Sequence, residues 1–158
     1  MADIIKPPTL FYSKEIFDSI FLAGSIEMGV AEQWQAKVEK AFADVNCTIF
    51  NPRRDDWDSS WVQTKDNPQF REQVEWELSA MTTADIIPVY FDPTTKSPIT
   101  LLELGLFHDK MIVCCPEGFW RKGNVDIVCE WFNVRQATTL QSLIDMTITA
   151  MDKRLYVA

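Results

Sequence analysis

Two carboxylates stand where the surrounding sequence favours apolar side chains. Glu103 lies in the segment "SPITLLELGLF" (97–107), which opens like a helix with Ser97 and Pro98 and is otherwise almost wholly apolar. A helix with no consistently polar side is expected to be buried nearly all round. Glu77 lies in an earlier predicted helix, beside the stripe expected to face the core. That stripe comprises Phe70, Val74, Leu78 and Met81.

A buried carboxylate is costly unless it is paired, hydrogen-bonded or lining a ligand cavity. Thr100, one turn before Glu103, is placed to share such a cavity. For either glutamate alone, a structural bond to a backbone amide or an arginine explains its position about as well as function does. The two together favour function. Paired carboxylates suit chemistry at a sugar anomeric carbon, where one attacks or stabilises an oxocarbenium-like centre and the other moves a proton.

Other reactive groups are scarce. His108 is the only histidine, and the four cysteines show no C-x-x-C spacing, which disfavours a zinc site or a Ser-His-Asp arrangement. We therefore expect neither a metal ion nor another cofactor. Asp85 and Asp92 bracket a predicted strand, and Asp92 is expected at its carboxyl end, facing the same crevice as the two glutamates.

The elements that must position these residues alternate along the chain. Such alternation predicts one α/β domain over residues 1–158, with roughly five mainly parallel strands, helices on both faces and ligands bound beyond the carboxyl ends of the strands. Residues 1–18 are expected to be an irregular extension before a core at 19–158, and Pro88 conflicts with a central strand. Strands are predicted at 19–24, 47–51, 85–91, 111–116 and 125–132, and helices at 31–43, 68–81, 98–107 and 139–155.

Composition narrows the class of ligand. The chain has 158 residues, 47% of them hydrophobic, and a net charge of −8. An acidic protein is a poor binder of nucleic-acid polymers or anionic membranes, so a small uncharged ligand is favoured. There is no apolar run of membrane-spanning length and no signal-peptide pattern, and we expect a cytoplasmic protein.

Three segments in order carry a family resemblance. "FLAGSI" (21–26), "ADIIPVYFDP" (84–93) and "SPITLLELGLF" resemble the nucleoside 2-deoxyribosyltransferase-like family, which includes a deoxynucleotide N-glycosidase branch. The resemblance covers roughly residues 19–130 and rests most on the E-L-G tripeptide that begins at Glu103. It implies a flavodoxin-like fold, a homo-oligomer, and transfer of 2-deoxyribose between nucleobases through an ester with Glu103.

The resemblance also assigns roles to individual residues. Glu77 stands where the family usually has an aspartate that handles the proton, and Asp92 where a second acid contacts the sugar or base. Asp85 is the acid that opens the strand. Glu103 is expected to be ionised at neutral pH and its proton-handling partner to have a raised pKa. The remaining candidate binding residues are Gly24, Ser25, Ile26, Asp55, Asp56, Trp57, Ser97, Thr100, Asn124 and Tyr156.

Several of these positions have ordinary explanations as well. Gly24 and Ser25 fit a tight turn, Asn124 fits a turn residue, and the stretch around Trp57 fits a solvated loop or an oligomer contact as well as a cover for a base. Arg53 and Arg54 suit pairing with Asp55 and Asp56 or binding a phosphate. The alternatives to base exchange are hydrolysis of 2′-deoxynucleoside 5′-monophosphates and a nucleotide-binding module without catalysis.

Overall fold

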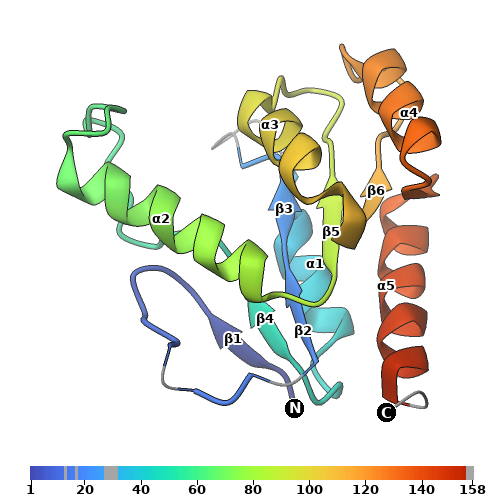
Figure 1. Cartoon of the computed structure of the whole chain (residues 1–158), viewed down its shortest axis with the longest axis horizontal. Coiled ribbons are helices and arrows are strands. Elements are labelled where there is room, and N and C mark those ends of the chain that lie inside the picture. Colours follow the sequence, from blue (N-terminus) through green and yellow to red (C-terminus); the bar gives the residue numbers. More distant parts are fainter. Residues whose placement is uncertain (13, 17, 27–31, 156–158) are drawn as a thin grey trace.

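A computed structural model of the chain describes residues 1–12, 14–16, 18–26 and 32–155. Parallel strands form its centre and helices flank them on both sides (Figure 1). β1 (Asp3–Ile5), β4 (Thr48–Phe50) and β2 (Ser19–Phe21) form one ladder in that spatial order. β3 (Ala23–Gly24), β5 (Ile87–Tyr90), β6 (Met111–Cys114) and β7 (Arg135–Ala137) form a second.

The two ladders are joined at β2 and β5. An isolated parallel bridge pairs Ile20 with Ile86, and Ala23 then pairs with Val89 in the same register. Pro88 lies between these two pairs and has no N–H to donate, which accounts for the break. A proline here predicts either an edge strand or an irregularity, and the structure shows the irregularity, because β5 is central and the lost donor interrupts its ladder. The strand order and the parallel sense are those of a flavodoxin-like α/β fold.

Alternate residues of each strand face opposite layers of helices. Phe21 and Val89 belong to the core beneath α2 (Pro68–Thr83), α3 (Pro98–Phe107) and α4 (Lys122–Trp131). Ile20 and Ile112 belong to the opposite core, beneath α1 (Trp34–Ala41) and α5 (Leu140–Leu155). The short 3₁₀ turn η1 (His108–Lys110) joins α3 to β6. The expectation of helices on both faces is confirmed.

Two expectations about single elements are wrong. Residues 125–132 are not a strand, since α4 covers most of them and β7 is the last strand. Val125 and Cys129, four residues apart, are buried in α4 while Trp131 is 80% exposed, so the run has a helical period. The segment 1–18 is not wholly irregular either, because β1 extends the sheet beside β4.

None of the described helices is long and apolar enough to cross a bilayer.

Candidate functional site

A cavity of about 720 Å³ lies between α2 and α3, at the carboxyl ends of β3 and β4. This is the edge where open parallel sheets bind ligands, and the volume suits a small molecule. Seven of the candidate residues line it: Gly24, Ile26, Trp57, Glu77, Ser97, Thr100 and Glu103. Its wall also contains apolar side chains, among them Phe21, Phe70, Val74, Leu78 and Met81.

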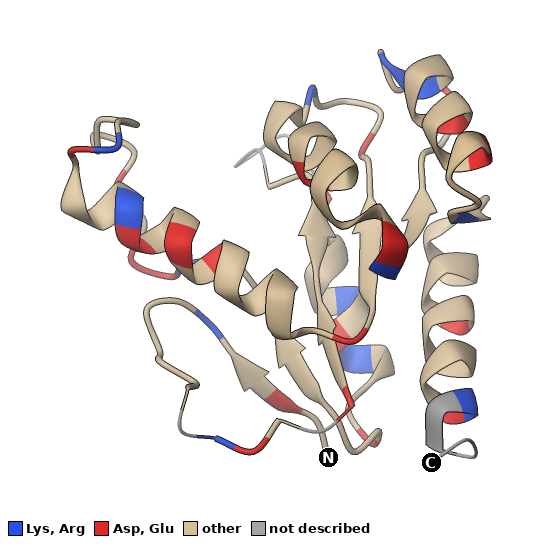
Figure 2. Ribbon diagram, in the orientation of Figure 1, with Lys and Arg blue, Asp and Glu red and all other residues tan. Residues whose placement is uncertain are grey.

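Glu103 faces this cavity from the buried side of α3. Thr100, Glu103 and Leu104 are the buried residues of the helix. Glu103 is 8% exposed, and within the described part of the chain its carboxylate has no hydrogen bond or ion pair. It is the only charged residue of α3, which is otherwise tan in Figure 2. The carboxylate is therefore placed for a ligand and has no evident structural partner.

The expectation that α3 is buried nearly all round is wrong. Ile99, Leu102 and Leu106 are 60%, 61% and 56% exposed. These three side chains share one helical face and line the cavity as well, so they form its apolar rim. The helix thus keeps its charge inside and part of its apolar surface outside, the reverse of a typical surface helix.

A cluster of three hydroxyls secures the start of α3. The Ser25 and Thr95 hydroxyls are 2.8 Å apart, and the Ser97 hydroxyl lies 2.7 Å from Ser25 and 2.8 Å from Thr95. Ser97 occupies the N-cap position with φ of 44°, a left-handed conformation that is rare for a residue other than glycine. Its side chain makes no capping bond and joins the cluster. Ser25 is buried there and does not line the cavity.

Glu77 reaches the cavity from α2, but the buried stripe of that helix differs from the predicted one. The buried residues are Gln73, Trp76, Ala80 and Met81. Phe70 and Val74 are only partly buried and Leu78 is 40% exposed, because these residues line the cavity and do not face the core. Only Met81 of the predicted stripe is buried. The residues of α2 that face the core are therefore shifted by roughly one position from the predicted stripe.

Both carboxylates have raised pKa values, and Glu77 contributes to the shift of Glu103. Burial raises the pKa of Glu77 to about 7, against a hydrogen bond from Gln73 that lowers it. Burial raises the pKa of Glu103 to about 8, and the charge of Glu77 raises it further. A raised pKa was expected for Glu77. A pKa of about 8 disagrees with the expectation that Glu103 is ionised at neutral pH, and burial is the main cause.

Gly24 is required by its surroundings. Its φ is +144°, and a Cβ atom there would lie 2.3 Å from the Tyr90 carbonyl oxygen and 2.9 Å from the Trp34 ring. No side chain fits between β3, β5 and α1 at this point. The bare backbone also contributes to the cavity wall.

Asp92 and Asp85 lie at opposite ends of β5. Asp92 is buried at the carboxyl end, where it accepts hydrogen bonds from the Glu32 and Thr94 backbone N–H groups at 2.8 and 2.9 Å. Burial raises its pKa, but a hydrogen bond from the Thr94 hydroxyl at 2.6 Å and the two N–H bonds outweigh burial, and the net pKa is lowered. Asp85 accepts from the Ser19 N–H and hydroxyl at the other end. The structure places neither residue in the cavity lining, and Asp85 lies at the edge away from it.

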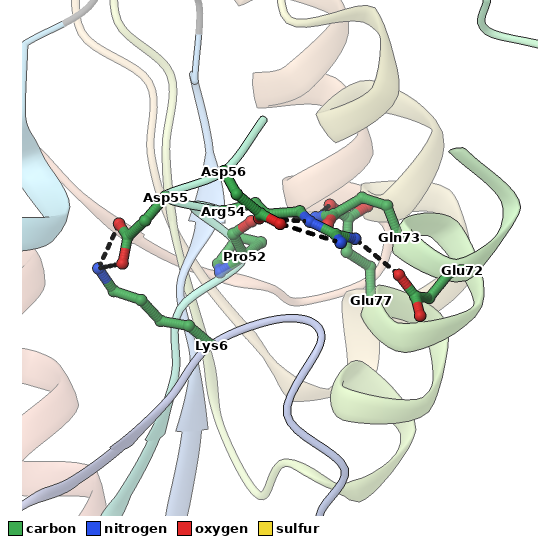
Figure 3. A network of polar contacts seen from close by, with 8 residues as sticks. All are labelled: Lys6, Pro52, Arg54, Asp55, Asp56, Glu72, Gln73 and Glu77. Carbon is green, nitrogen blue, oxygen red and sulfur yellow. Dashed lines mark hydrogen bonds and ion pairs between the residues drawn. The ribbon is translucent and has the colours of Figure 1, made fainter. Parts of the chain in front are cut away.

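The loop between β4 and α2 covers one side of the cavity. Trp57 lines it and packs edge-on against Trp61, with ring centroids 5.1 Å apart. Asp55 and Asp56 are not in the lining, since Asp55 pairs with Lys6 at 3.0 Å and Asp56 with Arg54 at 2.7 Å (Figure 3). Of the two arrangements considered for these aspartates, ion pairs and ligand contact, the structure shows ion pairs.

Two further candidates lie elsewhere. Asn124 belongs to α4 and lines a separate hollow of about 330 Å³ between α3 and α4. Tyr156 lies outside the described residues.

Sequence reasoning missed several residues of the cavity wall. Gln63 and Gln73 were not considered, and Arg53 and Arg54 were assigned only to pairing or a phosphate. Gln73 was detectable, because it precedes Glu77 by one helical turn and so shares its face. Gln63 comes from a loop with no periodic pattern, so no sequence signal pointed to it.

The sequence of the chain was compared with those of known protein families and proteins. The family profile described as nucleoside 2-deoxyribosyltransferase like matches residues 18–119. That range is more than half of the chain and contains both glutamates of the cavity. The chain belongs to this family. A search of curated proteins found no match. Membership indicates an enzyme of the glycosyl-transfer or glycosidase type, with a specific activity that must be argued from the site.

Proposed function

We propose that the protein cleaves the N-glycosidic bond of 2′-deoxynucleosides and transfers the deoxyribosyl group to another nucleobase, with Glu103 as nucleophile. One observation carries the proposal: the unpaired carboxylate of Glu103 and the carboxylate of Glu77 line the same cavity and interact electrostatically. Family membership supports the same chemistry. No oxidation or reduction is required.

In the first displacement, Glu103 must be ionised and Glu77 protonated. A Glu103 oxygen bonds to the anomeric carbon as the C–N bond breaks, and the bonding electrons leave with the base. Glu77 gives its proton to that base. The positive charge that develops on the sugar favours the ionised form of Glu103, which counteracts the burial that raises its pKa.

In the second displacement, an incoming base gives a proton to Glu77 and attacks the anomeric carbon. The bond to Glu103 breaks and its carboxylate is restored. Two inversions retain the configuration of the sugar, and the order of events predicts ping-pong kinetics. Trp57 is placed to cover a base, while the Leu102 and Leu106 rim limits the access of water.

Product analysis tests the proposal. The protein is incubated with thymidine or deoxyadenosine, with and without a second free base, and products are separated. We expect exchange in wild type, and a loss of about a thousandfold or more in Glu103→Gln and Glu103→Ala. Glu75→Gln is the matched control, because Glu75 is exposed on α2 and pairs with Arg71 at 2.6 Å.

Normal exchange in a folded Glu103→Ala protein would refute the nucleophile. Intact-mass measurement after rapid acid quenching should detect protein carrying one deoxyribosyl group. Binding of nucleosides with neither exchange nor hydrolysis would instead favour the binding module without catalysis.

A second candidate function is hydrolysis of 2′-deoxynucleoside 5′-monophosphates, with water in place of the incoming base. Arg53 favours it, since this side chain lines the cavity and has no ion pair within the described ranges. A guanidinium in a ligand cavity suits a phosphate. The same assay with thymidine 5′-monophosphate distinguishes the two functions.

If the monophosphate is the substrate, Arg53→Ala should raise KM for it by about tenfold or more and leave any activity on thymidine within about twofold. Equal effects on both substrates would remove Arg53 as a phosphate ligand.

A further inference from the structure

Gln73 links the candidate proton donor to the loop that covers the cavity. It lies on α2, one turn before Glu77, and is 6% exposed. Its Nε2 donates to Glu77 Oε1 at 2.7 Å and to the Pro52 carbonyl oxygen at 3.0 Å (Figure 3). Pro52 begins the segment that continues to Trp57.

The chemistry of these contacts decides how the amide is oriented. The Pro52 carbonyl oxygen can only accept, so the amide nitrogen of Gln73 must face it. Both hydrogens on that nitrogen are then used, one for Pro52 and one for Glu77. The Gln73 Oε1 atom is left buried with no hydrogen-bond partner.

This arrangement is costly for stability. A buried acceptor without a donor loses its hydration without replacement, and an apolar side chain of similar length would avoid that cost. The two N–H contacts offset part of it. A glutamine kept here with half its amide unsatisfied is better explained by what its N–H groups do to Glu77 than by packing.

The contact distinguishes the two oxygens of Glu77. Oε1 accepts an N–H bond, and the carbonyl oxygen of a protonated carboxyl group is a better acceptor than its hydroxyl oxygen, so a proton on this group favours Oε2. We propose that Gln73 is a positioning residue that directs the transferable proton of Glu77 to Oε2 and ties that carboxyl to the segment at Pro52. This inference rests on the proposed function, in which Glu77 protonates the departing base.

The proton balance is then explicit. The proton leaves Glu77 Oε2 for the departing base, as the electrons of the C–N bond move to that base and a Glu103 oxygen bonds to the anomeric carbon. Glu77 is left as a carboxylate whose Oε1 still accepts from Gln73. The same N–H therefore stabilises the charge that the step produces.

The other charged groups around Glu77 are known from the cavity wall. Glu103 faces it from α3, and Arg53 and Arg54 face the cavity from the β4–α2 loop. Arg54 is engaged by Asp56 at 2.7 Å and Glu72 at 2.8 Å. Gln73 is the side chain whose hydrogen bond lowers the pKa of Glu77 against burial. Its removal should therefore raise that pKa.

Gln73→Met tests the inference, with Gln69→Met as control on the exposed surface of the same helix. We expect kcat to fall about tenfold to hundredfold with KM within about twofold, since the substrate contacts remain. The alkaline limb of the pH–kcat profile should move to higher pH. Carboxyl ¹³C NMR, assigned with Glu77→Gln, should show the pKa of Glu77 raised, whatever reaction the protein catalyses.

Gln73→Leu serves as a second variant if Gln73→Met does not fold, because it removes the donor and brings no charge next to Glu77. Unchanged kcat together with an unmoved pKa of Glu77 would overturn the inference. A raised pKa with unchanged kcat would also overturn it, because the proton would then not need directing. If wild type neither exchanges nor hydrolyses nucleosides, the proposed function fails, and the NMR titration still decides whether Gln73 acts on Glu77.

Discussion

Glu103 and Glu77 share a cavity and must be considered as a coupled pair. With pKa values of about 8 and about 7, the pair holds one proton near neutral pH. The higher pKa of Glu103 favours that proton on Glu103, whereas the proposed step needs it on Glu77 and a charge on Glu103, so the bound substrate must shift the distribution. A second proton blocks the nucleophile, and loss of the last proton removes the acid. Both sides of neutrality should therefore be inactive.

We accordingly expect a bell-shaped dependence of kcat/KM on pH, with its maximum between about pH 7 and about pH 8. Steady-state rates from pH 5 to about pH 10 in buffers of constant ionic strength measure it. Glu77→Gln should abolish the alkaline limb, because the amide has no proton to lose in this range. A flat profile through neutrality would show that the pair does not control turnover.

The raised pKa of Glu103 also predicts a pH-dependent cost to stability. The unfolded chain loses this proton near its usual value of 4.5, whereas the folded protein keeps it up to about 8. The folded state therefore binds more protons between these values, and its stability falls as the pH rises through that window. At lower pH both states are protonated and the cost is absent.

Glu103→Gln should relieve this cost. We expect its free energy of unfolding to exceed that of wild type by on the order of 2 kcal/mol at about pH 8, and the gap to disappear near pH 4. Urea denaturation at the two pH values measures the gap. An equal difference at both would mean that packing and not ionisation separates the two proteins.

At the scale of the elements, the packing around β3 leaves no space for a side chain at Gly24. Gly24→Ala would force a Cβ atom to 2.3 Å from the Tyr90 backbone oxygen of β5, and backbone cannot yield as a side-chain tip can. We expect a loss of about 2–4 kcal/mol in unfolding free energy, measured by urea denaturation. Gly105→Ala in α3 is the control, because a Cβ there would meet nothing within 4 Å.

The helices differ in how far their sequences predicted them. Asn67 and Pro68 predicted the start of α2. The structure shows Asn67 as its N-cap, with its side chain accepting hydrogen bonds from the Gln69 and Phe70 N–H groups. The face that α2 buries could not be found in the same way. Some apolar residues of α2 face the core and others face the cavity. The periodic pattern alone does not tell which of the two faces is buried. α4 was assigned as a strand because its apolar residues form a short, nearly continuous run.

The whole molecule exposes an apolar rim around the cavity. Ile99, Leu102 and Leu106 of that rim are between 56% and 61% exposed, and Leu78 of α2, which also lines the cavity, is 40% exposed. A homo-oligomer, which the family resemblance implies, would cover such a surface. The expectation stays a prediction.

Sedimentation equilibrium should therefore give a mass that is a multiple of the 18.2 kDa chain. Leu106→Glu at the edge of the rim should shift the protein toward the monomer, whereas Glu130→Gln on α4 should not. A wild-type mass of one chain would contradict the expectation.

Identifying Glu103 needed no coordinates, because a single charge in an apolar helix is a local property of the chain. Glu77 was singled out beside a predicted core stripe, most of which lines the cavity instead. The alternation of strands and helices likewise predicted the parallel sheet and the edge at which the cavity lies. The partners of Asp55, Asp56 and Asp85 depended on contacts across 49, 2 and 66 positions, most of which no local pattern encodes. Which side of each helix meets the cavity, and how strongly burial and the charge of Glu77 raise the pKa of Glu103, follow from the packed arrangement. Burial and electrostatic fields are sums over neighbours that only folding brings together.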